Sequence, residues 1–271
     1  MHLRSFVVLL AGCLTLPAHA AAEPREGVDV GRPSALRKLV PAEGIERQAA
    51  REFSQLKRQA AAHDALVPAT HPQSRRLRQI AGRLIPHAGR FNERARQWQW
   101  EVILIDAKQV NAFCMPGGKI AVFAGLLLGL DLSDDEAAMV LGHEIAHALR
   151  EHARERIAKS QLTQLGASLL GEFVGGGKYA GLFSAGGHLM TLKFSRDDET
   201  EADSVGLELA ARAGYDPRAG ITLWRKMMAA SRGAPPQWLS THPSGKNRIQ
   251  EIERQLPAVM PLYEKAKSQS R

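Results

Sequence analysis

The sequence predicts an α+β fold, mostly α, with a small β-sheet. The two best-marked helices begin at Ser133 and at Arg196, and both have apolar residues at helical spacing. Two short apolar runs, Glu101–Ile105 and Gly118–Phe123, have the composition of β-strands. They bracket the turn Pro116-Gly117-Gly118, so we expect a small sheet or a hairpin before the first of these helices.

The helix that begins at Ser133 has the clearest start signal in the chain. Ser133 and Glu136 predict a capping box, and the acidic first turn suits the positive end of the helix dipole. The helix Arg196–Ala213 has Gly214 in the position of its C-cap. The other expected helices are Ile45–Ala62, Gln73–Ile85, Pro217–Ala230 and Ser244–Gln255.

A length of 271 residues and an apolar content of 44% predict one globular domain with appendages. Changes in composition divide the chain into a signal peptide over 1–20, a leader or linker over 21–42, a helical region over 43–95, a main domain over 96–256 and a tail over 257–271. Beyond the signal peptide no apolar run reaches about 20 residues, so we expect no membrane span.

The amino terminus has the three parts of a secretory signal peptide. Met1–Arg4 is basic, residues 5–16 are apolar, and Ala18-His19-Ala20 is a cleavage site of the Ala-x-Ala type. An alternative is a lipobox, Leu10-Ala11-Gly12-Cys13, in which Cys13 becomes a lipidated first residue. Both interpretations predict export to the periplasm, and the second predicts an anchor in the outer membrane.

The formal charge of +8 permits contact with an anionic membrane surface or an acidic partner. Membrane association is therefore compatible with the sequence, through lipidated Cys13 or through a basic surface. The basic residues are scattered along helical stretches without interleaved aromatic residues. Nucleic acid is not an expected partner for this reason. The sequence predicts no particular oligomeric state.

The chemistry begins with His143-Glu144-Ile145-Ala146-His147 in the middle of the capped helix. Two imidazoles four positions apart lie on one helix face, so both can bind one metal ion. Glu144 lies beside them and can take a proton from an attacking water molecule. The alternative, two structural histidines with a surface glutamate, is disfavoured by the helical context and by an acidic motif downstream.

A catalytic zinc ion needs a third protein ligand and one open position. Glu199 and Asp203 are four positions apart and lie on one face of the second helix. The simplest assignment makes Glu199 the ligand and Asp203 an acceptor that orients a ligand histidine. Glu201, which points roughly the opposite way, is the rival ligand. Asp197 and Asp198 are expected to be solvated carboxylates near the helix dipole.

Four ordered segments over about residues 100–250 carry a family resemblance. They are Asn111-Ala112-Phe113 with Pro116-Gly117-Gly118 and Gly125-Leu126-Leu127; Leu141-Gly142-His143-Glu144-Ile145-Ala146-His147; Ser195-Arg196 with Glu199-Thr200-Glu201-Ala202-Asp203 and Gly206; and Ala213-Gly214-Tyr215-Asp216-Pro217 with Thr241-His242-Pro243. The set resembles the HtpX-like and CAAX-prenyl-protease-like zinc metallopeptidases, a gluzincin family, especially its soluble exported bacterial members. Without the membrane-spanning helices of some members, the chain is not expected to act on prenylated substrates.

The resemblance implies a zincin-like catalytic domain over 96–256, with one Zn²⁺ per chain between two metal-ligand helices. It implies that His143, His147 and Glu199 are the ligands and that Glu144 is the general base. It therefore favours Glu199 over Glu201 as the third ligand.

The resemblance also implies two features around the metal. His242 resembles a histidine that either stabilises the developing oxyanion or occupies the open coordination position in a latent state. An edge strand is expected to pair with an extended substrate peptide. Its residues here are Lys119, Ile120, Ala121, Val122 and Phe123.

Three further residues near the motifs receive no part in the chemistry. His152 follows the motif by five positions, so on a continuing helix it points off the ligand face and is expected at the surface. His188 lies in a glycine-rich segment that forms either a lid over the cleft or a plain surface loop. Cys114 is expected to be a buried structural thiol.

These observations predict a secreted zinc-dependent endopeptidase that cleaves misfolded or unfolded envelope proteins. The alternative is a latent or non-cleaving zinc protein that binds unfolded chains as a chaperone does. Glu144 favours cleavage, because a site that only binds needs no general base. Unfolded or extended polypeptides are the expected partners in both cases. A hydrolase of other substrates is a third interpretation, because the metal chemistry is generic.

Overall fold

The structure is a computed structural model that describes residues 26–175, 189, 192–231, 237–242 and 247–269. The expected signal peptide, its cleavage site and the lipobox with Cys13 lie outside the described residues. His188 and most of the glycine-rich segment around it also lie outside them.

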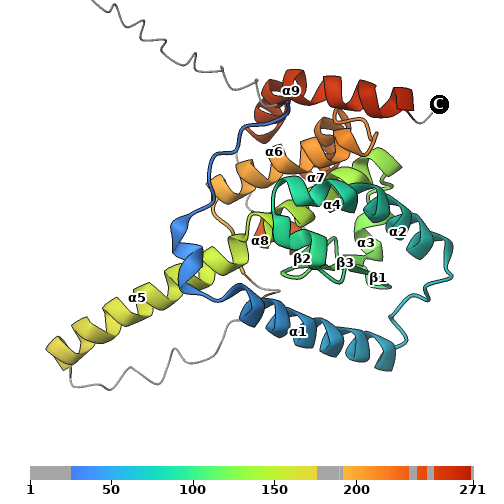
Figure 1. Ribbon diagram of the computed structural model, residues 1–271. Helices are drawn as coiled ribbons and strands as arrows, with labels where there is room; N and C mark the ends of the chain where they lie inside the picture. The colour runs from blue at the N-terminus through green and yellow to red at the C-terminus, as the bar shows by residue number, and fades with distance from the viewer. Residues whose placement is uncertain (1–25, 176–188, 190–191, 232–236, 243–246, 270–271) are drawn as a thin grey trace, which may run out of the picture.

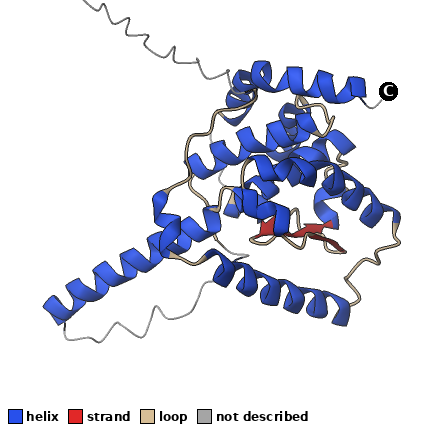
Figure 2. Ribbon diagram, viewed as in Figure 1, coloured by secondary structure: helices blue, strands red, loops and turns tan. Residues whose placement is uncertain are grey.

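The described residues form a mostly helical fold around a three-stranded sheet (Figures 1 and 2). The strands are β1 (Glu101–Ile105), β2 (Ala112–Met115) and β3 (Lys119–Phe123). The α-helices are α1 (Ala42–Ala62), α2 (Pro72–Leu84), α3 (Ala124–Leu127), α4 (Asp134–Leu149), α5 (His152–Gly175), α6 (Arg196–Arg212), α7 (Ala219–Ala230), α8 (Gln237–Thr241) and α9 (Arg248–Gln269). The 3₁₀ helices are η1 (Ala35–Leu39), η2 (Ile85–Arg90) and η3 (Glu93–Gln97). The predicted α+β class, mostly α, is confirmed.

The sheet has the strand order β1-β3-β2, with β3 parallel to β1 and antiparallel to β2. The expected turn joins β2 to β3, and φ is 81° at Gly117 and 77° at Gly118, a conformation that favours glycine. A small sheet is therefore present as predicted. The hairpin is formed by β2 and β3 rather than by the two predicted runs, because the short strand β2 lies between them.

The prediction that Lys119–Phe123 is an edge strand is wrong. This strand, β3, is hydrogen-bonded on both sides, and the side chains of Ile120, Ala121 and Val122 are at most 1% exposed. A continuous apolar run of this kind is typical of a strand buried on both faces. The sheet has two edge strands, β1 and β2. Ile105 of β1 forms a bridge to Leu66 on its outer side, so among the described residues the free edge, without a strand or bridge partner, belongs to β2.

Helices cover both faces of the sheet, with α1 on one face and α4 on the other (Figure 1). The core under α1 contains Ile45, Ala49, Phe53, Ile103, Ile105 and Ala121. The opposite face packs under α4, and α2, α6, α7 and α9 extend this larger core. Strand residues therefore alternate between two cores, as the period of two in a strand requires.

The predicted helical region 43–95 and tail 257–271 are built into these same cores. Buried Leu77 and Ile80 place α2 against the larger core. Helix α9 continues without a break through the predicted boundary at 257, and Val259 and Leu262 are buried within it. The tail is thus part of the last helix up to residue 269. Across the described residues, no helix combines the length and the apolarity that crossing a membrane requires.

Helices α4 and α6 begin with the same type of cap. Ser133 and Glu136 exchange hydrogen bonds at the start of α4, which confirms the predicted capping box. Ser195 and Asp198 do the same at the start of α6. The expectation that Asp198 is solvated is wrong, because its side chain caps the helix and is only 6% exposed. Asp197 is exposed, as expected.

Two glycines let the backbones of α4 and α6 touch. A Cβ atom at Gly142 would lie 2.8 Å from the carbonyl oxygen of Gly206. A Cβ atom at Gly206 would lie 2.8 Å from the amide nitrogen of His143. The contact therefore sets the separation of the two helices directly beside the first histidine of the motif.

We expect the Gly206→Ala substitution to push α4 and α6 apart. The neighbouring atoms belong to the backbone and cannot rotate away, so overpacking should cost about 1–3 kcal/mol of unfolding free energy. Zinc affinity should fall as well, because His143 moves relative to α6. Urea unfolding and a zinc competition titration measure the two effects.

The matched control for this variant is Gly82→Ala on the exposed side of α2. Nothing lies within 4 Å of a Cβ atom there, so alanine should stabilise the helix by about 0.5–1 kcal/mol. A Gly206→Ala protein as stable as the parent, with unchanged zinc affinity, would contradict the direct backbone contact.

Candidate metal centre

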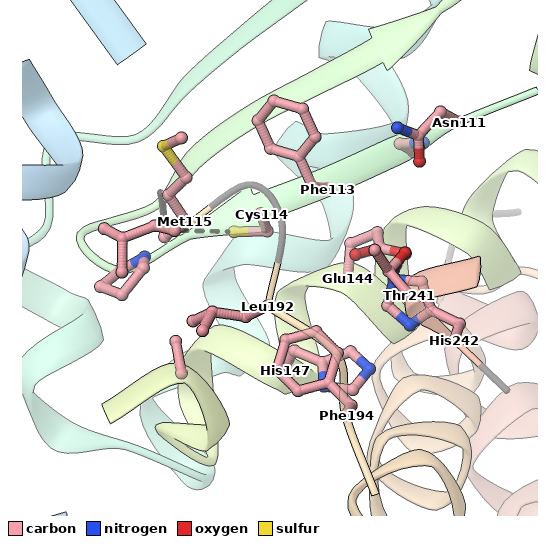
Figure 3. A pocket seen from close by; sticks show the side chains of 14 residues that line it. Asn111, Phe113, Cys114, Met115, Glu144, His147, Leu192, Phe194, Thr241 and His242 are labelled. Atoms are coloured by element: carbon pink, nitrogen blue, oxygen red, sulfur yellow. Dashed lines mark hydrogen bonds and ion pairs between the residues drawn. The ribbon is translucent and has the colours of Figure 1, made fainter. Parts of the chain in front are cut away.

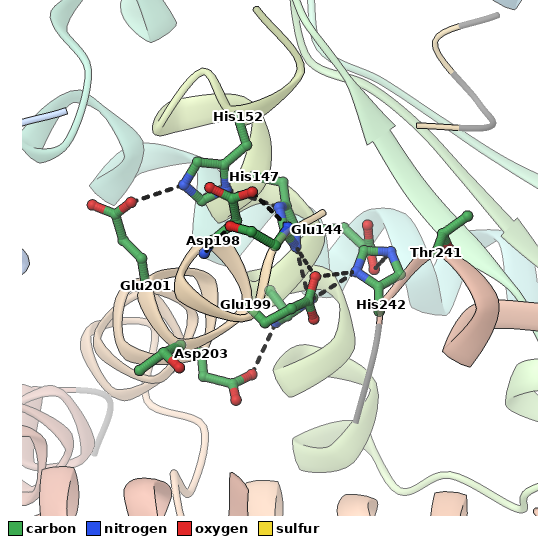
Figure 4. A network of polar contacts seen from close by, with 12 residues as sticks. Glu144, His147, His152, Asp198, Glu199, Glu201, Asp203, Thr241 and His242 are labelled. Carbon is green, nitrogen blue, oxygen red and sulfur yellow. Dashed lines mark hydrogen bonds and ion pairs between the residues drawn. The ribbon is translucent and has the colours of Figure 1, made fainter. Parts of the chain in front are cut away.

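Four buried side chains from separate parts of the chain converge at one point (Figure 4). His143 and His147 come from α4, Glu199 comes from the first turn of α6, and His242 directly follows α8. One potential ligand atom from each lies within 4.8 Å of the others. The expected ligands are therefore brought together, and His242 joins them.

The ligand atoms have the spacing of a tetrahedral zinc site. Nε2 of His143 lies 3.0 Å from Nε2 of His147 and 3.3 Å from Nδ1 of His242. Oxygens of Glu199 lie 3.0 Å from Nδ1 of His242 and 3.4 and 3.5 Å from the Nε2 atoms of His147 and His143. Four ligands at zinc bond lengths of about 2.0–2.1 Å lie about 3.3 Å apart. Three nitrogens and a carboxylate at this spacing fit zinc.

The surroundings give the ligands different pKa values. Burial opposes a charge on His143, but hydrogen bonds to Asp203 and Glu199 prevail and raise its pKa to about 9. Burial, aided by the nearby His143 and His242, lowers the pKa of His147 well below its usual range. Burial raises the pKa of Glu199, but its histidine neighbours lower it overall. A metal ion must therefore displace a proton from His143, while His147 and Glu199 are ready to bind.

Asp203 lies behind His143, as predicted. Its Oδ1 is 2.9 Å from Nδ1 of His143, which directs Nε2 of the ring toward the other ligands. Arg248 of α9 donates hydrogen bonds to both oxygens of Asp203 and, at 2.7 Å, to Oε2 of Glu199. Arg248 thus holds two carboxylates of the site. Its role was missed because an arginine 45 positions beyond Asp203 has no motif signal.

Glu144 lies beside the ligands with its carboxylate held in place. Its Oε1 accepts a hydrogen bond of 2.7 Å from Nε1 of Trp238 and lies 3.5 Å from Nε2 of His242. The Trp238 ring also stacks on His242, with centroids 4.8 Å apart and planes 23° apart. Trp238 therefore positions two residues of the site. No sequence pattern indicates this role, because a tryptophan on its own indicates only a core position.

A cavity of about 30 Å³ lies beside Glu144 and His147 (Figure 3). The free-edge strand β2 forms one wall, and Phe194 forms another. None of the described lining residues belongs to Lys119–Phe123. The strand next to the chemistry is therefore β2, because β3 lies one strand further away in the sheet.

The side chain of Phe194 covers one side of the cavity. The ring of Phe194 stacks on His147 with a centroid separation of 4.0 Å. The amide of Phe194 donates a hydrogen bond of 3.1 Å to the carbonyl oxygen of Thr241, which joins the segment before α6 to the end of α8. A volume of about 30 Å³ holds one or two water molecules.

Comparison with known sequences places this site in a family. The sequence profile of peptidase family M48 matches residues 71–256, more than half of the chain. The chain belongs to peptidase family M48. His143, His147 and Glu199 form the candidate zinc site of this M48 chain.

Several relatives of this M48 chain have names that describe a peptidase. The mitochondrial metalloendopeptidase OMA1 of Arabidopsis thaliana is 44% identical over 150 residues, which are 55% of this chain and 30% of that protein. The mitochondrial metalloendopeptidase OMA1 of Schizosaccharomyces pombe is 37% identical over 200 residues, 72% of this chain and 56% of that protein. The beta-barrel assembly-enhancing protease of Escherichia coli is 27% identical over 199 residues, 69% of this chain and 39% of that protein. The chain thus matches between 30% and 56% of the length of these relatives.

His152 of the M48 chain is not the surface residue that helical spacing predicts. It is 1% exposed, and its Nδ1 lies 2.9 Å from Nδ1 of His147. The prediction assumed a continuous helix, but α4 ends at Leu149 and Glu151 has a φ of 60°. His152 therefore begins a new helix that brings its ring back to the ligand histidine.

Glu201, the rival ligand, does not belong to the ligand cluster. Its carboxylate instead contacts His152 at 2.8 Å and pairs with Arg150. Burial raises the pKa of Glu201, but His152 and Arg150 lower it overall, so the side chain is an ionised acceptor. Glu199 is thus a member of the ligand cluster, whereas Glu201 contacts His152 and Arg150 outside the cluster.

Cys114 differs in part from the expected buried thiol. It is half-buried and lines the cavity, and its Sγ is 3.6 Å from the carbonyl oxygen of Met115. Burial and the nearby Glu144 raise the pKa of this thiol well above its usual range. The protonated thiol is a poor nucleophile, so Cys114 serves as a wall of the cavity.

Proposed function

We propose that this chain is a zinc-dependent endopeptidase that hydrolyses peptide bonds in unfolded or extended polypeptides. The observation that carries the proposal is the meeting of a metal-binding cluster, Glu144 and the free edge of β2 around one cavity. Membership of peptidase family M48 supports the reaction class. Zinc, when bound, polarises the scissile carbonyl group and makes water acidic enough to lose a proton near neutral pH.

Residues of the chain transfer the proton and bind the substrate. Glu144 takes the proton from the attacking water molecule and delivers it to the leaving amine. Trp238 holds one oxygen of this carboxylate, which fixes its direction. The substrate pairs its backbone with the free edge of β2. Backbone pairing requires an extended chain and depends little on its sequence, which is why unfolded proteins are the proposed substrates.

We infer that His242 occupies the fourth ligand position in the conformation described. Its Nδ1 lies at ligand spacing from both His143 and Glu199, and the stacked Trp238 ring holds it there. The ring of Phe194 also stacks on His147 beside the cavity. These observations support the latent alternative over direct stabilisation of an oxyanion, and they favour a second candidate function: a resting zinc protein that binds unfolded chains without cleaving them.

We propose that the chain is exported to the periplasm. The support is the basic, apolar and Ala-x-Ala pattern over residues 1–20. Cleavage after Ala20 releases the chain, whereas lipidation at Cys13 anchors it to the outer membrane, and the mass of the mature amino terminus distinguishes these forms. Misfolded envelope proteins are the substrates that this location supplies.

The test combines zinc content with cleavage of casein, an unstructured substrate, in the purified mature chain. We expect about one zinc ion per chain, and cleavage that EDTA removes and added zinc restores. With free zinc at about 1,000 times its Kd, metal binding contributes about 4 kcal/mol, so EDTA should lower Tm by about 10 °C. Glu199→Ala should lose both zinc and cleavage, because it removes the only carboxylate of the ligand cluster among the described residues.

Asp197→Ala is the matched control, because it removes an exposed carboxylate two positions away on the same helix. It should retain zinc and cleavage. Cleavage that survives both EDTA and Glu199→Ala would contradict the proposed function. A parent chain that binds zinc but leaves casein intact would favour the latent protein, and His242→Ala should then start to cleave.

A further inference from the structure

The two ligand histidines of α4 are supported from behind in different ways. Nδ1 of His143 meets Asp203, and Arg248 holds that carboxylate. Nδ1 of His147 meets a third imidazole, His152, at a distance of 2.9 Å (Figure 4). On the far side of His152, Nε2 lies 2.8 Å from Oε2 of Glu201. An imidazole is thus inserted between ligand and carboxylate on the His147 side only.

The hydrogen-bond chain allows one arrangement of protons when His147 binds a metal. A metal-binding Nε2 has no proton, so the proton of the neutral His147 ring is on Nδ1 and must be donated. The atom that faces it, Nδ1 of His152, must then be an acceptor. The proton of His152 is therefore on Nε2, where Glu201 accepts it. Both hydrogen bonds are therefore donated in the same direction, from His147 to His152 and from His152 to the carboxylate of Glu201.

The far end of the chain is anchored. Arg150 pairs with Oε1 of Glu201, the oxygen that His152 does not contact. The same guanidinium group donates to the carbonyl oxygens of Val30 and Gly31, at 3.2 and 3.1 Å. Glu201 is thus held from two directions, and the leader segment is part of the support.

The backbone is shaped to place His152. Glu151 adopts a left-handed conformation, φ 60°, which costs free energy in a residue other than glycine. Its carboxylate is held by Arg37 and Arg154, at 2.6 Å in both cases. This held turn ends α4 and directs the first residue of α5 back to His147, where its ring meets that of His147 edge to face.

We propose that His152 is a positioning residue for the metal site. It accepts the Nδ1 proton of His147 and so selects the tautomer and the ring orientation in which Nε2 faces the metal. Glu201 acts through His152 by accepting its Nε2 proton. The inference rests on the proposed zinc site but not on peptidase activity, because its direct consequence is zinc affinity.

Two amide substitutions test the roles of the two ring nitrogens of His152 separately. His152→Asn places a side-chain oxygen where Nδ1 was, so the acceptor for His147 is kept. His152→Gln places its amide near the former Nε2, so the contact with Glu201 is kept and the acceptor for His147 is lost. We expect His152→Gln to weaken zinc binding about 10–100-fold, as removal of such a support does in other metal sites. His152→Asn should stay close to the parent.

Zinc affinity is measured by competition with a chromophoric chelator on the full mature chain. The visible spectrum of the Co²⁺-loaded protein reports the ligand geometry and should change in His152→Gln only. His63→Gln, at an exposed histidine after α1, is the matched control and should match the parent. Glu201→Gln keeps the shape of the side chain but removes its charge, so it should weaken zinc binding less than His152→Gln does. It also provides a test if His152→Gln does not fold.

The outcomes distinguish the proposals. Parent-like zinc affinity in both His152→Gln and Glu201→Gln would overturn the positioning role. Equal losses in His152→Asn and His152→Gln would also overturn it, because the Nδ1 acceptor would then be irrelevant. A parent chain that binds zinc tightly but cleaves nothing leaves the positioning role supported and contradicts only the peptidase. A parent chain that binds no zinc overturns the metal site and this inference together.

Discussion

Glu144→Gln should lower casein cleavage by roughly 10²–10⁴-fold, the usual contribution of a positioned general base. Glutamine keeps the size of the side chain and can still contact Trp238, but it cannot accept a proton from water. Zinc content should be unchanged, because Glu144 is not one of the four clustered ligand residues. Initial cleavage rates and metal analysis on the same preparation give the result.

The control for this variant is Glu253→Gln, at an exposed glutamate of α9 that is not part of the ligand cluster. It should cleave as the parent does, which excludes a general effect of losing one negative charge. Full activity in Glu144→Gln would show that another group accepts the proton. Loss of zinc together with activity would show that Glu144 belongs to the metal ligands instead.

Arg248→Met should destabilise the fold by about 3–5 kcal/mol, because it removes the positive partner of buried carboxylates. Arg248 is 6% exposed and contacts both Asp203 and Glu199. Burial raises the pKa of Asp203, but the charge of Arg248 and the hydrogen bond from His143 lower it overall. Without Arg248, the ionised carboxylate has lost its main compensating charge.

Urea unfolding of the Arg248→Met protein should be measured with zinc and with EDTA. The loss of unfolding free energy should be larger in EDTA than with zinc, because a bound metal ion compensates part of the charge on Glu199. Arg254→Met, at an exposed arginine of the same helix that pairs only with Glu251 among the described residues, should change stability little. Equal, small changes in both variants would show that Arg248 does not hold the two carboxylates.

The sequence was sufficient for the parts of this protein that depend on local geometry. The spacing of His143 and His147 on a capped helix places both imidazoles on one face whatever surrounds the helix. The capping box at Ser133 and the glycine after α6 are satisfied by backbone groups within a few residues. The histidine pair, the base candidate and the ends of the two helices could therefore be predicted, whereas the family resemblance was needed to choose Glu199 over Glu201.

The same local reasoning failed where the chain changes direction. His152 was placed by helical spacing, which holds only while the helix continues, and the left-handed Glu151 ends it. The family resemblance predicts β3 at the sheet edge, although its apolar residues pack on both faces and its backbone pairs on both sides. Strand order depends on which partner supplies hydrogen bonds, and that partner is set by tertiary packing.

The sequence by itself thus determined the pair of candidate ligand histidines on α4 and the mostly helical fold around a small sheet, because caps and periodicity act within a few residues. Only the tertiary structure decided what surrounds the metal. It brings His242 to His143 across 99 positions, and it stacks Phe194 on His147 beside the cavity. It also places Arg248 and Trp238 against buried carboxylates. These contacts join residues that are distant in sequence, and only burial in a shared core makes an unpaired charge costly enough to require them.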